Sequence, residues 1–253
     1  MRENYTLTRL YVDQDLSLGA QISLSKPQLH YLASVLRKGT EDKIRLFNGR
    51  DGEWEAEITQ MTRKAASLTC QDNLRPQNPS PDIALIFAPV RKHRTAFIIE
   101  KATELGVSTL QPLITEHTQF SKFNPEKVRL QSIEAAEQTE RLDVPHIMPV
   151  IKDVNGLIEA WAEGYKGRSL IFADEAVAGT PAAQPAKTVL ENLSGPCALL
   201  VGPEGGFSQR ERKILQAQNF VQTVSLGPRI LRADTAALAL LTLWQAMNGD
   251  WNA

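Results

Sequence analysis

The sequence contains little cysteine and little histidine. Its 253 residues include two cysteines, Cys70 and Cys197, and four histidines, and neither cysteine belongs to a CxxC pair or has a histidine near it. This spacing excludes a disulfide framework and a zinc-finger type of metal site. We therefore expect no metal ion and a reduced, cytoplasmic environment.

Long apolar runs and a secretory signal are also missing. The longest apolar run, at about 236–244, is too short to span a bilayer and predicts a buried helix instead. The first residues lead into mixed polar sequence, with no basic stretch before an apolar core, so we expect no signal peptide. These features predict a protein that acts without a membrane.

The sequence also lacks a large excess of positive or negative charge. There are 28 lysines and arginines against 29 aspartates and glutamates, a net charge of −1. The chain as a whole is therefore no strong polyanion binder, and nucleic-acid binding would have to depend on local patches. One basic patch lies at 91–94, although the start of a solvated helix would have the same composition.

A proline-rich stretch divides the chain. Residues 72–81 contain three prolines and few apolar side chains, which is typical of a linker. We predict a first domain at 1–74, a linker at 75–82 and a second domain at 83–253, because the sequence pattern differs on the two sides.

Short strands dominate the predicted first domain. Trp54, Ala56 and Ile58 alternate with glutamates and threonine, which predicts a half-buried strand, and residues 48–52 read as a hairpin loop. One helix is expected after Ser25, a good N-cap residue, and its apolar face would contain Leu29, Leu32, Ala33 and Leu36. This pattern predicts a small β-rich domain.

Strands alternate with helices in the predicted second domain. Strands are expected at 83–87, 110–115, 169–173, 197–201 and 221–226. Helices are expected at about 125–141 and at 233–247, and two more would contain Ala96 to Thr103, ending at Gly106, and run from the 200–208 corner through Ala217. Such alternation predicts an α/β fold with a mostly parallel sheet and helices on both faces. In sheets of this kind, ligands bind beyond the carboxyl ends of the strands.

Two glycine-proline corners follow predicted strands. The first, LVGPEGGFS at 200–208, would present free backbone N–H groups at a helix start. It matches neither GxxxxGK[ST] nor GxGxxG, so a P-loop or a dinucleotide fingerprint is excluded. A plain turn would explain this corner equally well when it is considered alone.

The second corner adds two arginines. Gly227 and Pro228 precede Arg229 and Arg232, which would share a face on a helical turn but not on a loop. These arginines can bind a carboxylate, a phosphate or a developing oxyanion, or they can brace the turn by pairing with Asp234. Two such corners on consecutive strands favour a shared pocket.

The two corners, together with segments elsewhere in the chain, resemble a known family. The segments LVGPEGGFSQRE (200–211) and LGPRILRADTAAL (226–238) resemble the signatures of the RsmE family, whose members methylate uridine N3 in 16S ribosomal RNA. HYLASVLRK (30–38) resembles the helix of that family's PUA-like RNA-binding domain, and residues 97–107 and 134–138 match further blocks. The family usually has glutamate where this chain has Asp234.

The resemblance implies a SPOUT-type knotted parallel sheet after the PUA-like domain, with S-adenosylmethionine as the cofactor. It also implies a homodimer that acts on 16S rRNA or the small ribosomal subunit. The backbone of the two corners would bind the cofactor, and the residues that correspond to this site are Leu200, Gly202, Pro203, Glu204, Gly205, Leu226, Gly227, Ile230, Leu231, Thr235 and Ala236.

For catalysis we expect Arg232 first and Arg229 second, because uridine N3 becomes nucleophilic when charge on the uracil oxygens is stabilised. The general base is not identified from the sequence. Candidates for RNA binding are Arg9, Arg37, Lys38, Lys92 and Arg94, each of which can also be an ordinary surface charge. Alternative functions are another SPOUT RNA methyltransferase, acting on a ribose 2′-hydroxyl or a guanine, and a non-catalytic RNA-binding assembly protein.

Overall fold

The computed structural model describes residues 6–120, 122–182, 184–193 and 195–252. Its contacts divide the chain into two compact units: residues 1–79 together with 136–144, and residues 80–135 together with 145–253. The contact division falls at 79/80, within the predicted linker of 75–82, and the return of 136–144 to the first unit was not predicted.

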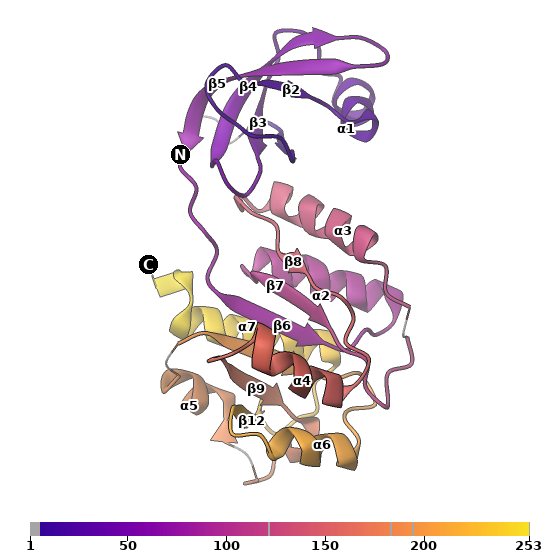
Figure 1. The fold of residues 1–253 in the computed structure, drawn as a ribbon, viewed down its shortest axis with the longest axis vertical. Helices are drawn as coiled ribbons and strands as arrows, with labels where there is room; N and C mark the ends of the chain where they lie inside the picture. Colours follow the sequence, from indigo (N-terminus) through magenta and orange to yellow (C-terminus); the bar gives the residue numbers. More distant parts are fainter. Residues whose placement is uncertain (1–5, 121, 183, 194, 253) are drawn as a thin grey trace. The chain divides into compact units, whose positions relative to one another are not determined.

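The first unit contains a five-stranded sheet in the order β1-β3-β4-β5-β2 (Figure 1). Strand β1 is parallel to β3, and the other pairs are antiparallel. The bounds are β1 Arg9–Tyr11, β2 Gln21–Ser23, β3 Lys43–Phe47, β4 Glu53–Met61 and β5 Ala66–Arg75. The small β-rich fold and the hairpin loop between β3 and β4 confirm the sequence prediction.

The predicted helix of this unit begins as expected. Helix α1 (Lys26–His30) is capped by Ser25, whose hydroxyl accepts a hydrogen bond from the Gln28 N–H in a capping box. It continues into a wider π-helical turn, η1 (Tyr31–Val35). Leu29 and Leu32 are buried, as their spacing predicts, so the apolar face packs on the sheet core.

A buried cluster of charges also belongs to this unit. The strand pattern leaves Glu53 on the polar side of β4, yet its side chain is only 2% exposed. It accepts hydrogen bonds from Arg9 (2.6 Å), Arg75 (2.9 Å) and Arg45 (3.4 Å). Burial alone would raise the pKa of Glu53, but the hydrogen bonds from Arg75 and Arg9 outweigh it and lower the pKa.

The second unit is built on a seven-stranded sheet in the order β10-β12-β9-β11-β6-β7-β8, in which every pair is parallel. The strands are β6 Ile83–Phe87, β7 Thr109–Pro112, β8 His146–Ile147, β9 Ser169–Ala173, β10 Gln184–Pro185, β11 Cys197–Val201 and β12 Val221–Ser225. The α/β fold with a parallel sheet is therefore confirmed.

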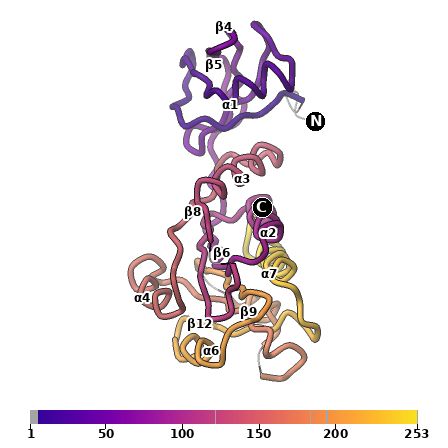
Figure 2. Tube along the Cα trace, turned by 90° about the vertical axis from the view of Figure 1, so that its right-hand side faces the viewer, coloured from indigo at the N-terminus to yellow at the C-terminus, as the bar shows by residue number. Residues whose placement is uncertain are grey.

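Helices cover both faces of this sheet. Their bounds are α2 Lys92–Glu104, α3 Pro125–Gln138, α4 Val154–Gly164, α5 Ala186–Glu191, α6 Gln209–Gln216 and α7 Ala233–Asn248. In Figure 2, α4 and α6 lie on one side of the strands, and α2 and α7 on the other. Neighbouring residues of β11 show the same division, because Leu199 packs with the α7 side and Leu200 with the α4 side.

Two of these helices were not predicted. Helix α4 starts after Asp153, whose carboxylate accepts a hydrogen bond from the Gly156 N–H, and it buries Val154, Leu157 and Trp161. The Trp161 ring stacks on Phe220 at 4.6 Å between ring centres. Helix α5 lies in the segment between β9 and β11 that the sequence suggested was an irregular connection. The trefoil knot implied by the resemblance stays a prediction.

Both cysteines are reduced and buried. Burial raises the pKa of Cys197 to about 12, so its thiol stays protonated in the core of the second unit. Among the described residues, no group of three or more metal-ligating side chains comes together. The helices within the described ranges are also too short or too polar to cross a membrane.

Candidate functional site

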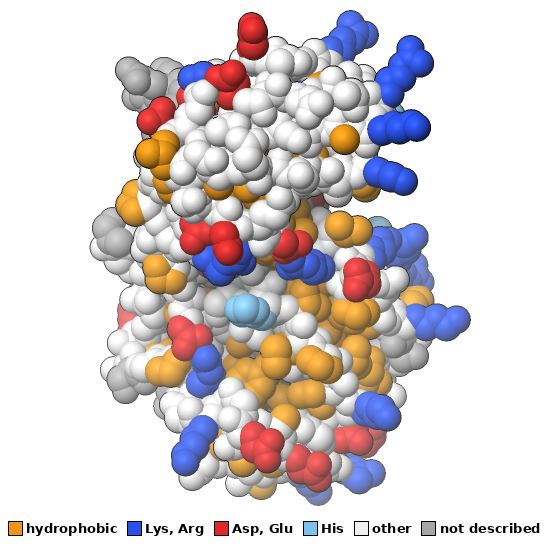
Figure 3. Space-filling view, turned by 45° about the horizontal axis from the view of Figure 1, so that its top comes forward, with side chains coloured by type: hydrophobic (Ala, Val, Ile, Leu, Met, Phe, Trp, Pro, Cys, Tyr) orange, Lys and Arg blue, Asp and Glu red, His pale blue; other side chains and the backbone are white. Residues whose placement is uncertain are grey.

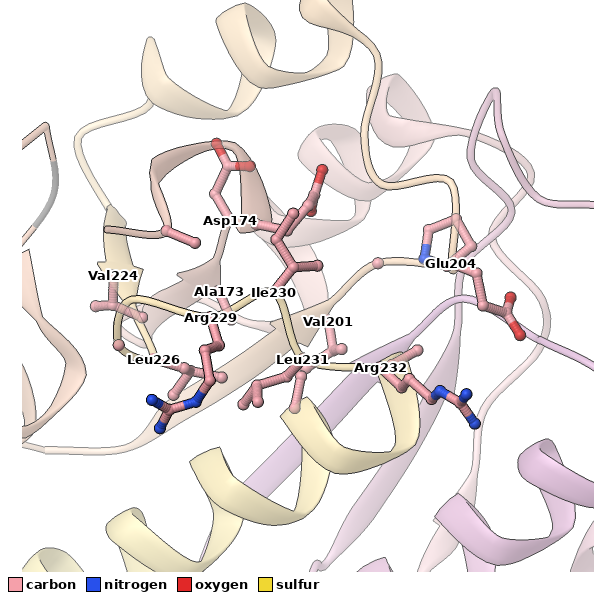
Figure 4. A pocket seen from close by; sticks show the side chains of 17 residues that line it. Ala173, Asp174, Val201, Glu204, Val224, Leu226, Arg229, Ile230, Leu231 and Arg232 are labelled. Atoms are coloured by element: carbon pink, nitrogen blue, oxygen red, sulfur yellow. The ribbon is translucent and has the colours of Figure 1, made fainter. Parts of the chain in front are cut away.

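The two glycine-proline corners line one cavity at the carboxyl ends of β9, β11 and β12 (Figure 4). Its volume is about 170 Å³, and its lining residues are Ala173, Asp174, Glu175, Ala178, Val201, Gly202, Pro203, Glu204, Val224, Leu226, Gly227, Arg229, Ile230, Leu231, Arg232, Ala233 and Ala236. The structure thus shows the pocket that the two corners were predicted to share.

A third segment completes this cavity. In the sheet, β9 lies between β11 and β12, so the residues that follow β9 separate the two corners. Asp174 and Glu175 come from this segment, and sequence reasoning missed them. Their position was the available signal, because they directly follow a buried strand and ligands of α/β sheets bind beyond the carboxyl ends of strands.

The glycines of the first corner make room for groups of the protein itself. A Cβ atom on Gly202 would lie 2.6 Å from the ring of buried Phe207, and one on Gly206 would collide with the Glu175 carboxylate. Gly206 alone of the three has a positive φ, +66°. The corner therefore needs glycine at these two positions for its own packing.

Contacts with the loop after β7 fix this corner further. Ser208 caps α6, and Glu211 completes the capping box. The buried Glu211 carboxylate also accepts a hydrogen bond from the Glu116 N–H at 2.9 Å. In the same loop, His117 Nδ1 lies 2.9 Å from the Gly205 carbonyl oxygen. The loop after β7 thus holds the first corner both at Gly205 and at the start of α6.

Asp174 presents an unused acceptor at the cavity. Its Oδ1 accepts hydrogen bonds from Arg212 Nε at 2.9 Å and from the Ala176 N–H at 3.0 Å. Its Oδ2 is buried and has no partner among the described residues. A buried polar atom in a native protein usually has a hydrogen-bond partner, so this oxygen is suited to accept a hydrogen bond from a ligand.

The two arginines of the second corner do not act as a pair. Residues 226–232 form a loop, not a helical turn, and Figure 4 shows Arg229 and Arg232 extending in opposite directions from it. Among the described residues, neither pairs with Asp234, whose Oδ1 lies 4.0 Å from Arg94 Nη1. The bracing role is thus excluded, and each guanidinium is exposed beside the cavity.

Most residues predicted to bind the cofactor line this cavity: Gly202, Pro203, Glu204, Leu226, Gly227, Ile230, Leu231 and Ala236. Three others are placed differently. The side chain of Leu200 is fully buried in the α4 side of the core, and Gly205 is exposed next to His117. Thr235 lines a separate apolar depression with Phe97 and Leu238.

The residues predicted to bind RNA fall into three groups. Arg37 and Lys92 are exposed, which fits the prediction. Lys38 and Arg94 are partly exposed but engaged, Lys38 with Asp42 at 3.5 Å and Arg94 with Asp234 at 4.0 Å. Arg9, in contrast, is buried.

Arg9 is buried in the first unit, not placed on its surface. Its side chain is 2% exposed, and its donors are engaged by Glu53 and by the backbone carbonyl groups of Ala136, Glu137 and Arg141. The prediction that Arg9 contacts RNA is therefore wrong. Its guanidinium instead binds the 136–144 segment to the first unit.

An apolar surface accompanies the site. Figure 3 shows hydrophobic side chains gathered in the lower half of the view, with both acidic and basic side chains around them. Helices α2 and α7 form an apolar depression lined by Phe97, Leu226, Asp234, Thr235, Leu238, Ala239, Thr242 and Leu243. Phe97 is 39% exposed there, beside partly exposed Leu238 and Leu243.

Comparisons with known proteins agree with this geometry. Residues 76–245 match the family of the RNA methyltransferase domain, and residues 24–69 match the RNA methyltransferase PUA domain. The ribosomal RNA small subunit methyltransferase E of Rickettsia conorii is 32% identical, over 92% of this chain and 93% of that protein. The protein of the same name from Synechocystis is also 32% identical, over 94% of this chain and 77% of its own length.

Solved structures are similar over almost the full length. The ribosomal RNA small subunit methyltransferase E of Neisseria gonorrhoeae, bound to S-adenosyl methionine, has a TM-score of 0.81 and 29% identity, and the match covers 97% of this chain and 99% of that one. A methyltransferase of Legionella pneumophila in complex with the cofactor SAM has a TM-score of 0.80 and 29% identity, and the match covers 96% and 99% of the two chains.

Proposed function

Because this chain belongs to the ribosomal RNA small subunit methyltransferase E family, we propose that it transfers a methyl group from S-adenosylmethionine to uridine N3 in 16S ribosomal RNA. The observation that carries this proposal is the single cavity formed by both signature corners. Membership of a fold class alone would not support it, because function depends on the site.

The lining of the cavity suits this cofactor. Leu226, Leu231 and Ala236 offer apolar surface for an adenine ring, while the backbone of the corners offers hydrogen-bonding groups for its edge. The free Oδ2 of Asp174 can accept a hydrogen bond from an N–H or O–H of the ligand. The volume of about 170 Å³ is small for the whole molecule, so we expect part of it to project past Ile230, which is 75% exposed.

Asp174→Asn tests this fit. The substitution keeps the shape of the side chain but can place an amide N–H where the free acceptor lies, so S-adenosylmethionine should bind about tenfold or more weakly. Isothermal titration calorimetry measures the dissociation constant. Asp82→Asn is the matched control, because Asp82 pairs with Arg168 in the same unit and lies outside the cavity lining. The affinity of this variant for S-adenosylmethionine should equal that of the unchanged protein. Equal affinities for both variants would exclude Asp174 from the cofactor site.

The chain's own residues would prepare the base for attack. S-adenosylmethionine, when bound, supplies a methyl group on a positively charged sulfur. Loss of the N3 proton to a base would leave negative charge on N3 and the uracil oxygens. That charge would be neutralised as N3 bonds to the methyl carbon and the carbon–sulfur bond breaks, which leaves the sulfur as a neutral thioether. Arg232, exposed beside the cavity, can donate hydrogen bonds to those oxygens. Arg229 is the second candidate, and an RNA phosphate is its alternative partner.

We assign RNA capture in part to the first unit, whose residues 24–69 match the PUA domain. Exposed Arg37 and partly exposed Lys38 are its candidate contacts. The substrate, 16S rRNA or the small ribosomal subunit, implies action in the cytoplasm. The target uridine must be unpaired in this substrate, because a Watson–Crick pair would cover its N3 atom.

A homodimer is also proposed. The depression between α2 and α7 is lined by exposed Phe97 and by partly exposed Leu238, Ala239 and Leu243, and a second copy of the chain can cover this apolar surface. Light scattering of the purified protein should give twice the mass of one chain. A monomer at working concentration would refute this part of the proposal.

The function is tested by supplying the purified protein with small ribosomal subunits and S-adenosylmethionine. Mass spectrometry with base-resolved mapping should find the new methyl group on uridine N3. A product on a ribose 2′-oxygen or on guanine would instead support another RNA methyltransferase of the same fold. Absence of methylation, together with no thermal stabilisation by S-adenosylmethionine, would favour a non-catalytic RNA-binding protein.

A further inference from the structure

A second, larger concavity lies within the second unit, outside the cavity described above. Its volume is about 490 Å³, in the range of small-molecule sites. It is lined by the segment after β6, the start of α2, the loop after β7 and the start of α3: Pro89, Val90, Lys92, Thr95, Ala96, Ile99, Gln119, Phe120, Lys122, Phe123, Asn124, Lys127, Val128 and Gln131. We refer to these residues as the lysine groove.

The charge of the lysine groove has one sign. Lys92, Lys122 and Lys127 are exposed, and the lining contains no aspartate or glutamate. Among the described residues, none of the three lysines has a carboxylate partner, in contrast to Lys38 and Lys101. Three unpaired ammonium groups around a concave surface attract a polyanion.

Aromatic side chains supply the second feature. Phe120 is 38% exposed on the groove. Phe123 is partly buried against the core, with its ring centre 6.3 Å from that of Phe87, so the floor beneath is firmly packed. Exposed aromatic rings beside lysines are the usual means of holding unpaired nucleotides, whose bases stack while their phosphates pair with the cations.

The lysine groove belongs to the same edge of the sheet as the cofactor cavity. The segments that follow β6 and β7 form it; β6 pairs with β11, and β7 is the next strand beyond β6. The loop after β7 also contacts the first corner through His117, and α2 contacts the start of α7 through Arg94 and Asp234. A strand of RNA in the groove would therefore run toward the cavity.

We propose that the lysine groove binds a single-stranded stretch of RNA next to the target uridine, with a base stacked on Phe120 and phosphates on Lys92, Lys122 and Lys127. This inference rests on the proposed function, since it identifies where the substrate of that reaction is held. It adds Phe120, Lys122 and Lys127 to the residues that the sequence indicated.

The test uses a fluorescent oligouridine of about ten nucleotides, a length that covers one such site, and measures its dissociation constant by anisotropy at several salt concentrations. The triple variant Lys92→Ala, Lys122→Ala, Lys127→Ala should bind at least tenfold more weakly at low salt. Its slope of log affinity against log salt should fall by about 2, since each lost phosphate contact removes about 0.7. A triple alanine variant of Lys152, Lys166 and Lys187, which are exposed in the same unit, is the matched control and should keep the slope.

Substitutions of Phe120 test base stacking separately from the charge of the lysines. Phe120→Ala and Phe120→Leu should both weaken binding about tenfold, because leucine preserves apolar volume but cannot stack, and neither should change the salt slope. Unchanged affinity and slope in the triple groove variant would overturn the proposal, as would a loss that the control variant shows equally. An unaltered Kd with Phe120→Leu would remove the stacked base from it.

Failure of the groove and failure of the proposed function can be told apart. Groove variants should retain wild-type affinity for S-adenosylmethionine by calorimetry, because their side chains lie outside the cofactor cavity. If the unchanged protein binds oligouridine through the groove but methylates no RNA, the proposed function fails and the groove stands. If it methylates 16S rRNA while groove variants bind and turn over RNA normally, the groove proposal fails alone.

Discussion

Arg232→Ala should lower the rate of uridine methylation by about 100- to 1,000-fold, the usual effect of removing one donor that stabilises developing negative charge. The Kd for S-adenosylmethionine should stay within about threefold of the wild-type value, since a loss of more would exceed about 0.65 kcal/mol of ground-state binding. The measurements are single-turnover methylation of small ribosomal subunits and calorimetric titration of the cofactor.

The position of Arg232 explains why its effect should be confined to the chemical step. It occupies the N-cap position of α7, and its side chain makes no capping hydrogen bond. Its guanidinium is exposed at the cavity and unpaired with Asp234, so removal breaks no internal contact that holds the corner. Arg229 extends to the opposite side, so we expect a smaller loss from Arg229→Ala.

Two further variants make this result specific. Arg210→Ala removes a guanidinium with a 73% exposed side chain next to the first corner, and methylation should remain close to wild type. Arg232→Lys keeps the charge but loses the planar fork of donors, so it should recover only part of the rate. Near-normal turnover by Arg232→Ala would remove Arg232 from the mechanism, and a parallel loss of cofactor affinity would place it in the cofactor site instead.

The regular parts of the second unit were predictable because their apolar residues follow clear patterns. Strands β6, β9 and β11 are fully or almost fully buried runs, and such runs are typical of central parallel strands. Helix α4 carried a comparable signal, Asp153 as a cap and Val154, Leu157 and Trp161 at helical spacing, but was not predicted. The two corners made a shared cavity predictable. The strand order was not predictable, and it places β9 between β11 and β12, the strands that precede the two corners.

Contacts distant in the sequence account for the other differences. Arg9 and Glu53 are ordinary surface residues by composition, and only the fold brings them together with the 136–144 segment. No local periodicity encodes that return of the chain, because polar groups make these contacts. The role of the glycines in the first corner was likewise hidden, since Phe207 and Glu175 fill the space at Gly202 and Gly206 only in the folded structure.

Glu53→Gln should destabilise the first unit by about 3–5 kcal/mol, the usual cost of removing one partner from a buried ion pair. Arg9, Arg45 and Arg75 all donate to Glu53, and the substitution leaves their charges without that counterion. Glu140 still pairs with Arg45 and Arg75. Among the described residues, Arg9 hydrogen-bonds to no carboxylate other than Glu53, so it would rely on backbone carbonyl groups. Hydrogen exchange of the β3, β4 and β5 amides during urea titration measures the stability of this unit separately.

A surface pair provides the matched control. Asp15 accepts a hydrogen bond from Arg50 at 2.8 Å, but its side chain is 93% exposed. Asp15→Asn removes the same charge from the same unit and should cost less than about 1 kcal/mol. If the two variants had equal stability, the buried charge cluster would not hold the unit together.

The pH dependence gives an independent measurement of the same cluster. The pKa of Glu53 in the folded protein lies below its ordinary value of 4.5, because the arginine hydrogen bonds outweigh burial. A carboxylate whose pKa is lowered by folding adds stability that is fully present above the unfolded pKa and is lost as pH falls through the folded one. Unfolding of the first unit should therefore become easier below about pH 4.5, and this acid dependence should be shallower in Glu53→Gln, which has no proton to take up. Parallel acid unfolding curves for the two proteins would show that other carboxylates control the transition.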